Sequence, residues 1–162
     1  ELDTVIYFEA LSEVSVRVSH DLFISKEMIS FDTDAVDRAI NSFLSKDYIR
    51  IREIDSFLVF PNVGYEWNKY LLESFLLSYS KKFALFNNGL SLNNVAGFVV
   101  KKSGQINDFI DACAAFLADG RIELKKVVAL NYLADMNVIS RRSYKDIDLA
   151  LRRAAQIRRR KE

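Results

Sequence analysis

The chain has 162 residues, half of them hydrophobic, and a net charge of +1. This length suggests one domain or two small ones, with enough apolar side chains for a substantial core. One proline and five glycines argue against a disordered or loop-rich chain, and a single cysteine excludes an internal disulfide. No run of 18 apolar residues is present, so we expect no membrane partner.

The sequence shows no signal peptide and no N-x-[ST] site, which predicts a cytoplasmic location. The first residue is not methionine, so the chain is compatible with a processed form or a fragment of a longer protein. If the chain is a fragment of an enzyme, we expect the catalytic part to lie elsewhere.

Charge is distributed unevenly along the chain. Residues 1–80 contain 14 acidic and 7 basic side chains, whereas residues 81–162 contain 8 acidic and 16 basic ones. The two halves therefore carry −7 and +8. This asymmetry indicates either an anionic partner for the basic half or two halves that pack together and attract each other.

The pattern of the first 60 residues predicts helices followed by a β-hairpin. We expect a helix over residues 3–11, a strand over 14–18, a short helix from residue 25 and a helix over 35–44. Two runs of strand-forming residues within 48–60, ended by a proline, predict the hairpin.

This order of elements, with apolar positions at Met28, Val36, Ile40 and Leu44, resembles a winged helix-turn-helix domain over about residues 3–61. The resemblance implies nucleic-acid binding or a protein-interaction role. In members that read DNA, the second helix of the pair enters the major groove.

Charge argues against that mode of reading in this chain. The second helix would present Asp34 and Asp37, whose carboxylates phosphates repel. Better candidates for a nucleic-acid contact are Arg50 and Arg52 on the predicted hairpin. The nearby acidic residues Glu53 and Asp55 reduce the net positive charge of this segment.

Helical spacing dominates the remainder of the chain. Apolar residues recur at steps of three and four over 65–86, 106–118 and 122–134, and a last helix should run from about 144 toward 160. The helix over 122–134 is apolar over much of its surface, so we expect it to be central and buried. The stretch 92–100 is compatible with a strand or a helix.

The predicted protein is therefore mainly α. A winged-helix-like unit with a small β-hairpin, residues 1–62, should be followed by a helical bundle-like unit, residues 63–162.

Catalytic and metal-binding patterns are absent from the sequence. His20 is the only histidine and Cys113 the only cysteine, so no usual zinc set can form, and no phosphate-binding glycine loop occurs. Cys113 lies on an apolar helical stripe and should be buried. We expect no enzyme activity, no metal and no cofactor.

The distinctive feature is a cluster of arginines and lysines near the C-terminus. At about 100° per residue, most of the basic side chains fall on one side of a helix and the apolar ones on the other. Arginine matches phosphate geometry, so the cluster predicts phosphate contacts. The predicted nucleic-acid-binding residues are Arg141, Arg142, Lys145, Arg152, Arg153, Arg159 and Arg160, together with Arg50 and Arg52.

Two other interpretations of the cluster stay open. Cations near a helix C-terminus interact favourably with the helix dipole without any ligand. Contact with a membrane surface is less favoured, because the apolar side lacks tryptophan and phenylalanine.

These patterns predict a non-catalytic nucleic-acid-binding or regulatory module, with DNA preferred over RNA. The alternative is a protein-protein interaction domain of a larger assembly, with the acidic N-terminal unit as the docking face. An oligomer is compatible with either function.

Overall fold

The computed structural model describes the backbone of residues 2–162 and the side chains of residues 6–162. Over this range the protein has six α-helices and two small antiparallel sheets, and it is mainly α, as predicted. The elements in chain order are α1 (Leu2–Val14), β1 (Ser15–Arg17), β2 (Phe23–Ser25), the 3-10 helix η1 (Lys26–Met28), α2 (Thr33–Asn41), β3 (Tyr48–Arg50), the 3-10 helix η2 (Ile51–Glu53), α3 (Lys69–Ser78), β4 (Phe83–Phe86), β5 (Phe98–Lys101), α4 (Phe109–Asp119), α5 (Lys126–Asp135) and α6 (Ile147–Lys161).

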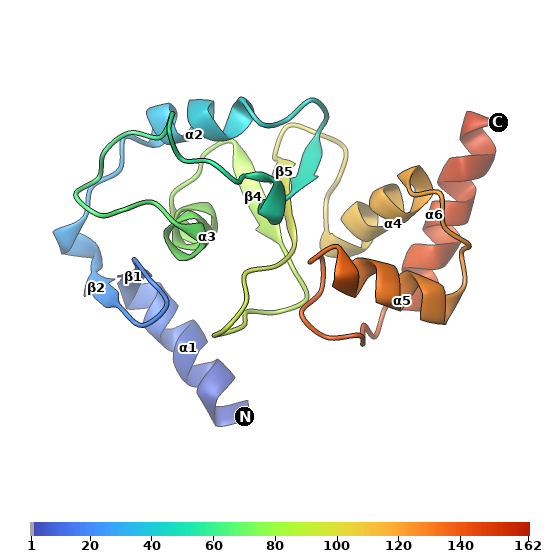
Figure 1. Ribbon diagram of the computed structural model, residues 1–162, viewed down its shortest axis with the longest axis horizontal. Coiled ribbons are helices and arrows are strands. Elements are labelled where there is room, and N and C mark those ends of the chain that lie inside the picture. Colours follow the sequence, from blue (N-terminus) through green and yellow to red (C-terminus); the bar gives the residue numbers. More distant parts are fainter. Residues whose placement is uncertain (1) are drawn as a thin grey trace.

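A three-stranded sheet in the order β3-β5-β4 lies at the centre of the molecule (Figure 1). Its alternate side chains face two different helical layers. Ile49 and Val99 share a buried cluster with α2 and α3, whereas Tyr48, Phe98 and Val100 share one with α4, α5 and α6. The sheet therefore joins the N-terminal helices to the C-terminal ones.

The N-terminal elements extend from the side of α3. Strands β1 and β2 form a hairpin in which Val16 pairs with Ile24, and both side chains are buried with Leu71 of α3. Helix α1 lies at one end of the molecule and α4, α5 and α6 at the other (Figure 1). This hairpin covers part of α3.

The predicted hairpin within residues 48–60 is wrong. Strand β3 is formed, but it pairs with β5, which lies some 50 positions later in the chain, with Tyr48 opposite Val100. Residues 57–60 form a turn instead of a strand. Phe57 and Phe60 both pack on Trp67, and this aromatic contact outweighs the strand propensity of the segment.

The predicted helix over 65–86 is also shorter than expected. Helix α3 ends at Ser78, and residues 83–86 form β4. Asn68 begins the helix by accepting hydrogen bonds from the backbone N–H groups of Tyr70 and Leu71. The run 83–86 is apolar throughout, and such a run is compatible with either a helix or a strand. Its pairing with β5 makes it a strand.

One buried cluster spans the predicted domain boundary at residue 62. Val36 and Ile40 of α2 pack in this cluster with Phe75 of α3 and Val99 of β5.

The expectation that helix α5 is central is wrong. This helix lies on the outside of the C-terminal helices, and its Val127 is 70% exposed.

Candidate nucleic-acid interface

Helix α6 carries most of the predicted phosphate-binding residues. Its buried side consists of Ile147, Ala150 and Ala154, and the two alanines allow close approach to α4. The periodicity that predicted one packed side and one basic side is confirmed for Ile147 and Ala154.

Several basic side chains near the C-terminus are paired with other groups of the protein. Arg153 donates a hydrogen bond to Asp111 of α4 at 2.6 Å, and Arg142 donates one to Asp135 at 3.1 Å. Arg158 is half-buried and donates to backbone carbonyls at the C-terminal end of α4. The contacts of Arg153 and Arg158 hold α6 against α4, and all three arginines have less charge available to a ligand.

Three arginines of α6 remain exposed: Arg152, Arg159 and Arg160. Within residues 6–162 their side chains make no ion pair or hydrogen bond. Lys145 is exposed in the same way, whereas Arg141 is exposed but takes part in an interaction of its own. We call Arg152, Arg159 and Arg160 the arginine face, because at 100° per residue they fall within one side of the helix.

Arg50 and Arg52 lie apart from the arginine face. The guanidinium of Arg50 donates to the carbonyl of Met136 at 3.2 Å and pairs with Glu53 at 3.3 Å. It is half-buried between η2 and the end of α5, so its predicted role in a wing has no structural basis. Arg52 is exposed and lines a separate cavity with Lys69.

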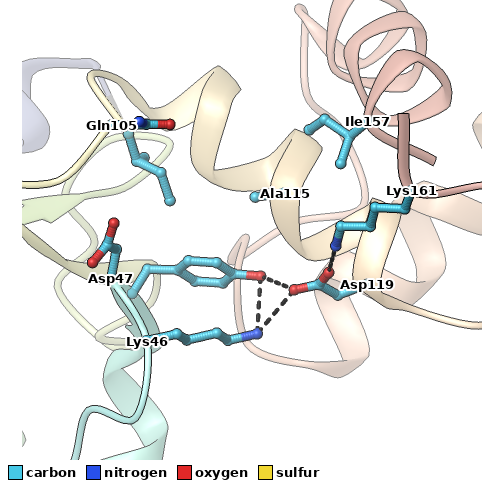
Figure 2. A pocket seen from close by; sticks show the side chains of 9 residues that line it. Lys46, Asp47, Gln105, Ala115, Asp119, Ile157 and Lys161 are labelled. Carbon is cyan, nitrogen blue, oxygen red and sulfur yellow. Dashed lines mark hydrogen bonds and ion pairs between the residues drawn. The ribbon is translucent and has the colours of Figure 1, made fainter. Parts of the chain in front are cut away.

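A shallow cavity between β3 and α6 contains a neutralised cluster of charges. Figure 2 shows the carboxylate of Asp119 between Lys46 and Lys161. The hydroxyl of Tyr48 also donates to this carboxylate, at 2.8 Å. Burial opposes ionisation, but these hydrogen bonds lower the pKa of Asp119 to about 2. Both lysines are already paired with this carboxylate, so the cavity is poorly suited to binding an anion.

A second cavity, of about 550 Å³, has a different charge character. Its lining brings together two Lys-Lys pairs, one before β4 and one at the end of β5. The register of the antiparallel strands places Phe83 opposite Lys101, and the backbone N–H of Lys102 donates to the carbonyl of Lys82 at 2.9 Å. We call this site the lysine cavity; it is lined by Asn41, Lys81, Lys82, Phe83, Lys101, Lys102 and Ser103.

Buried polar groups hold the lysine cavity in shape. Asp37 of α2 is fully buried and accepts hydrogen bonds from the hydroxyl of Ser80 and from the backbone N–H groups of Lys81 and Lys82. The expectation that Asp37 is exposed and repels phosphates is therefore wrong. Its spacing in α2 turns the carboxylate inward, where it organises the turn that carries two lysines.

Sequence reasoning missed the lysine cavity. The helical pattern over 65–86 places Lys81 and Lys82 inside a long helix, whereas α3 ends at Ser78. The available signal was the presence of two Lys-Lys pairs, each next to a strand-forming run. Only the pairing of β4 with β5 brings these pairs together.

The remaining reactive groups lie outside both basic surfaces. His20 is exposed and pairs with Asp21, and its second ring nitrogen lies 3.1 Å from Asn93. Cys113 is fully buried, and burial raises the pKa of its thiol. Among the described residues, no three histidine, cysteine or acidic side chains gather as a metal site would require.

None of the helices over residues 2–162 combines the length and apolar character needed to cross a bilayer. Comparison with known proteins found no matching family model, no matching curated protein and no matching solved structure.

Proposed function

We propose that the protein is a non-catalytic nucleic-acid-binding module, with DNA as the expected form, and that it contacts phosphates through the lysine cavity and the arginine face. The lysine cavity carries this proposal, because four lysines from two distant segments line a single hollow. Cationic side chains that neutralise phosphates supply most of the sequence-independent affinity for nucleic acid.

One loop leads from the lysine cavity to the cavity beside α6. Residues 101–103 line the lysine cavity, and Gln105 and Ile106 line the neighbouring cavity that also contains Lys161 of α6. Arg159 and Arg160 directly precede Lys161 in the chain. At 100° per residue, Lys161 points to the opposite side of α6 from Arg152 and Arg159, so we propose the lysine cavity and the arginine face as two separate phosphate contacts.

The order of elements supports a revised winged-helix assignment. Helix α2, strand β3, the short helix η2, helix α3 and the β4–β5 hairpin follow one another between residues 33 and 101. This is the order that the resemblance required, displaced by about 30 residues. We propose that the winged-helix-like unit is this segment, not residues 1–62.

In this unit α3 takes the place of the second helix of the pair. Its Leu71, Leu72 and Phe75 are buried, and the β1–β2 hairpin packs on it. Within α3 only Lys69, Leu77 and Ser78 are exposed, so insertion of this helix into a major groove would require the β1–β2 hairpin to move away. We therefore place the nucleic acid at the end of the sheet, where the lysine cavity lies.

The proposal is tested by measuring the binding of labelled duplex DNA, and of RNA of the same sequence, over a range of salt concentrations. Affinity should fall steeply with salt. Combined replacement of Arg152, Arg159 and Arg160 by alanine should reduce the slope of log K against log salt by about 3. A protein that fails to bind at low salt would exclude the proposal.

A matched control removes the same charge from elsewhere. Lys125, Lys126 and Arg121 are exposed and lie outside both basic surfaces, and Lys125 and Lys126 are paired with Glu123 and Asp148. Their combined replacement by alanine should leave the salt slope close to that of the parent. If both triple variants change the slope equally, net charge and not a contact surface governs binding.

The alternative, a protein-interaction domain, is favoured by one observation. Leu58 and Val59, at the turn after η2, are 95% and 63% exposed. Large apolar side chains at an exposed tip suit a protein partner better than phosphates. Association through these residues should depend little on salt, so the same titration separates the two functions.

A further inference from the structure

We infer that the lysine cavity binds a phosphate group that carries more than one negative charge, such as diphosphate or the terminal phosphate of a nucleic-acid strand. The inference deepens the proposed function and, for the nucleic-acid source, rests on it. Three observations on the cavity carry it: its buried support, its available donors and its charge.

The buried support fixes the backbone beneath the lysines. Ser80 donates to Asp37 at 2.6 Å, and its hydroxyl oxygen accepts from the backbone N–H of Phe83 at 2.9 Å. The ammonium of Lys102 donates to the carbonyl of Ser80 at 2.8 Å. A cavity ordered before binding loses less conformational entropy when a ligand arrives.

The donors that face a ligand differ in availability. Within residues 6–162, the side chains of Lys82 and Lys101 make no ion pair or hydrogen bond, so all their N–H groups are available. Lys81 lies 3.5 Å from the exposed Asp34, a weak pair that a stronger anion can displace. Asn41 and Ser103 add an amide and a hydroxyl to the lining.

Charge matching sets the minimum charge of the ligand. Four ammonium groups around one hollow repel one another, and the buried carboxylate of Asp37 compensates only part of this charge. An internal phosphodiester brings one negative charge. A terminal phosphate brings about 1.5 to 2 at neutral pH, and a diphosphate brings at least as much. The cavity therefore suits a chain end or a free diphosphate better than an internal phosphate.

The first experiment uses inorganic diphosphate as the probe and isothermal titration calorimetry as the readout. Replacing Lys82 and Lys101 together by glutamine should weaken diphosphate binding by about tenfold or more, since two charge-assisted contacts are lost. Lys125→Gln with Lys126→Gln, an equal loss of charge on α5, should leave binding unchanged. Dimethyl phosphate, a monoanionic diester, should bind at least tenfold more weakly than diphosphate.

The second experiment compares 5′-phosphorylated and 5′-hydroxyl oligonucleotides of one sequence. Tighter binding of the phosphorylated strand, abolished by the Lys82 and Lys101 double variant, identifies a strand end as the source. If diphosphate binds but the two strands bind equally, the source is a free phosphorylated compound. Both results support the cavity as a site for a multiply charged phosphate.

The inference is overturned if diphosphate does not bind, if both double variants lose affinity equally, or if dimethyl phosphate binds as tightly as diphosphate. Failure of the proposed function gives a different pattern, in which diphosphate binds and no oligonucleotide does. If oligonucleotides bind but diphosphate does not, the proposed function is supported and only this inference is contradicted. Circular dichroism of the Lys82 and Lys101 double variant should match the parent, because Lys82 is exposed, Lys101 is half-buried, and within residues 6–162 neither side chain makes a hydrogen bond or ion pair.

Discussion

The hydroxyl of Ser80 donates a hydrogen bond to the carboxylate of Asp37 at 2.6 Å, across 43 positions of the chain. This contact attaches the turn before β4 to the buried side of α2. The same carboxylate accepts the backbone N–H groups of Lys81 and Lys82. One buried side chain thus supports both the fold and the position of two lysines of the lysine cavity.

Replacing Asp37 by asparagine should destabilise the protein. The amide nitrogen is a donor, so it would leave at least one of the three donors around position 37 without an acceptor. The expected loss is about 1–3 kcal/mol in the free energy of unfolding, measured by urea titration. Asp34→Asn, on the exposed side of α2, should change stability by less than about 0.5 kcal/mol. Equal stability of the two variants would contradict the role of Asp37.

The half-buried guanidinium of Arg158 closes the C-terminal end of α4. It donates to the carbonyls of Leu117 and Ile122 at 2.8 and 3.0 Å, and also to those of Ala118 and Gly120. Arg158→Ala should lower the free energy of unfolding by about 1–3 kcal/mol, because these carbonyls lose their partner at a helix end. The adjacent Arg159→Ala provides the control and should have little effect on stability. If Arg159→Ala destabilised the protein more than Arg158→Ala, Arg158 would not be the residue that holds α4 and α6 together.

We expect the stability of the protein to depend on pH because of Glu73 in α3. Burial raises the pKa of Glu73 from 4.5 to about 7, against the lowering influence of Arg17 and Lys69. In this pH range the folded protein holds the proton that the unfolded chain has released. Stability should therefore fall as pH rises from about 4.5 to 7, by about 3 kcal/mol at most.

Glu73→Gln should flatten this dependence, since glutamine does not titrate. Urea unfolding at intervals between pH 5 and pH 8 provides the measurement, and Glu66→Gln, at an exposed position, is the control. Parallel pH profiles for the parent and Glu73→Gln would exclude Glu73 as the source.

Cys113 should react slowly with a thiol reagent in the native protein and rapidly after denaturation. Its side chain is fully buried on α4, and burial raises the thiol pKa, so little thiolate is exposed to the reagent. The rate of 5,5′-dithiobis-(2-nitrobenzoic acid) labelling, followed by absorbance with and without urea, measures the difference. Rapid labelling of the native protein would place Cys113 in an accessible site and reopen the question of catalysis.

Local signals predicted several elements of the fold. Helices α2 and α4 form close to the predicted ranges 35–44 and 106–118, and each begins after an aspartate, Asp32 or Asp108, that accepts a hydrogen bond from a backbone N–H group. The apolar spacing of α6 predicted its buried side correctly at Ile147 and Ala154. These features depend on residues three or four positions apart, which a sequence displays directly.

Pairing between distant segments was not predictable in this way. Strand propensity marked Tyr48 as part of a strand, but its partner could be the nearby run at 57–60 or the distant run at 98–101. Propensity describes how a segment fits a pleated surface and contains no information on its partner. The contact of Phe57 and Phe60 with Trp67 removes the nearby run from the sheet.

By itself, the sequence determined that the protein is mainly helical, that its second half is basic, and that one side of its last helix is charged. Only the tertiary structure decided which charges remain available to a ligand. Arg153 and Arg158 bind groups of α4, whereas the pairing of β4 with β5 brings Lys82 and Lys101 to one cavity. The physical reason is that charge availability depends on neighbours in space, and those neighbours come from segments about 20 to 40 positions away in the chain.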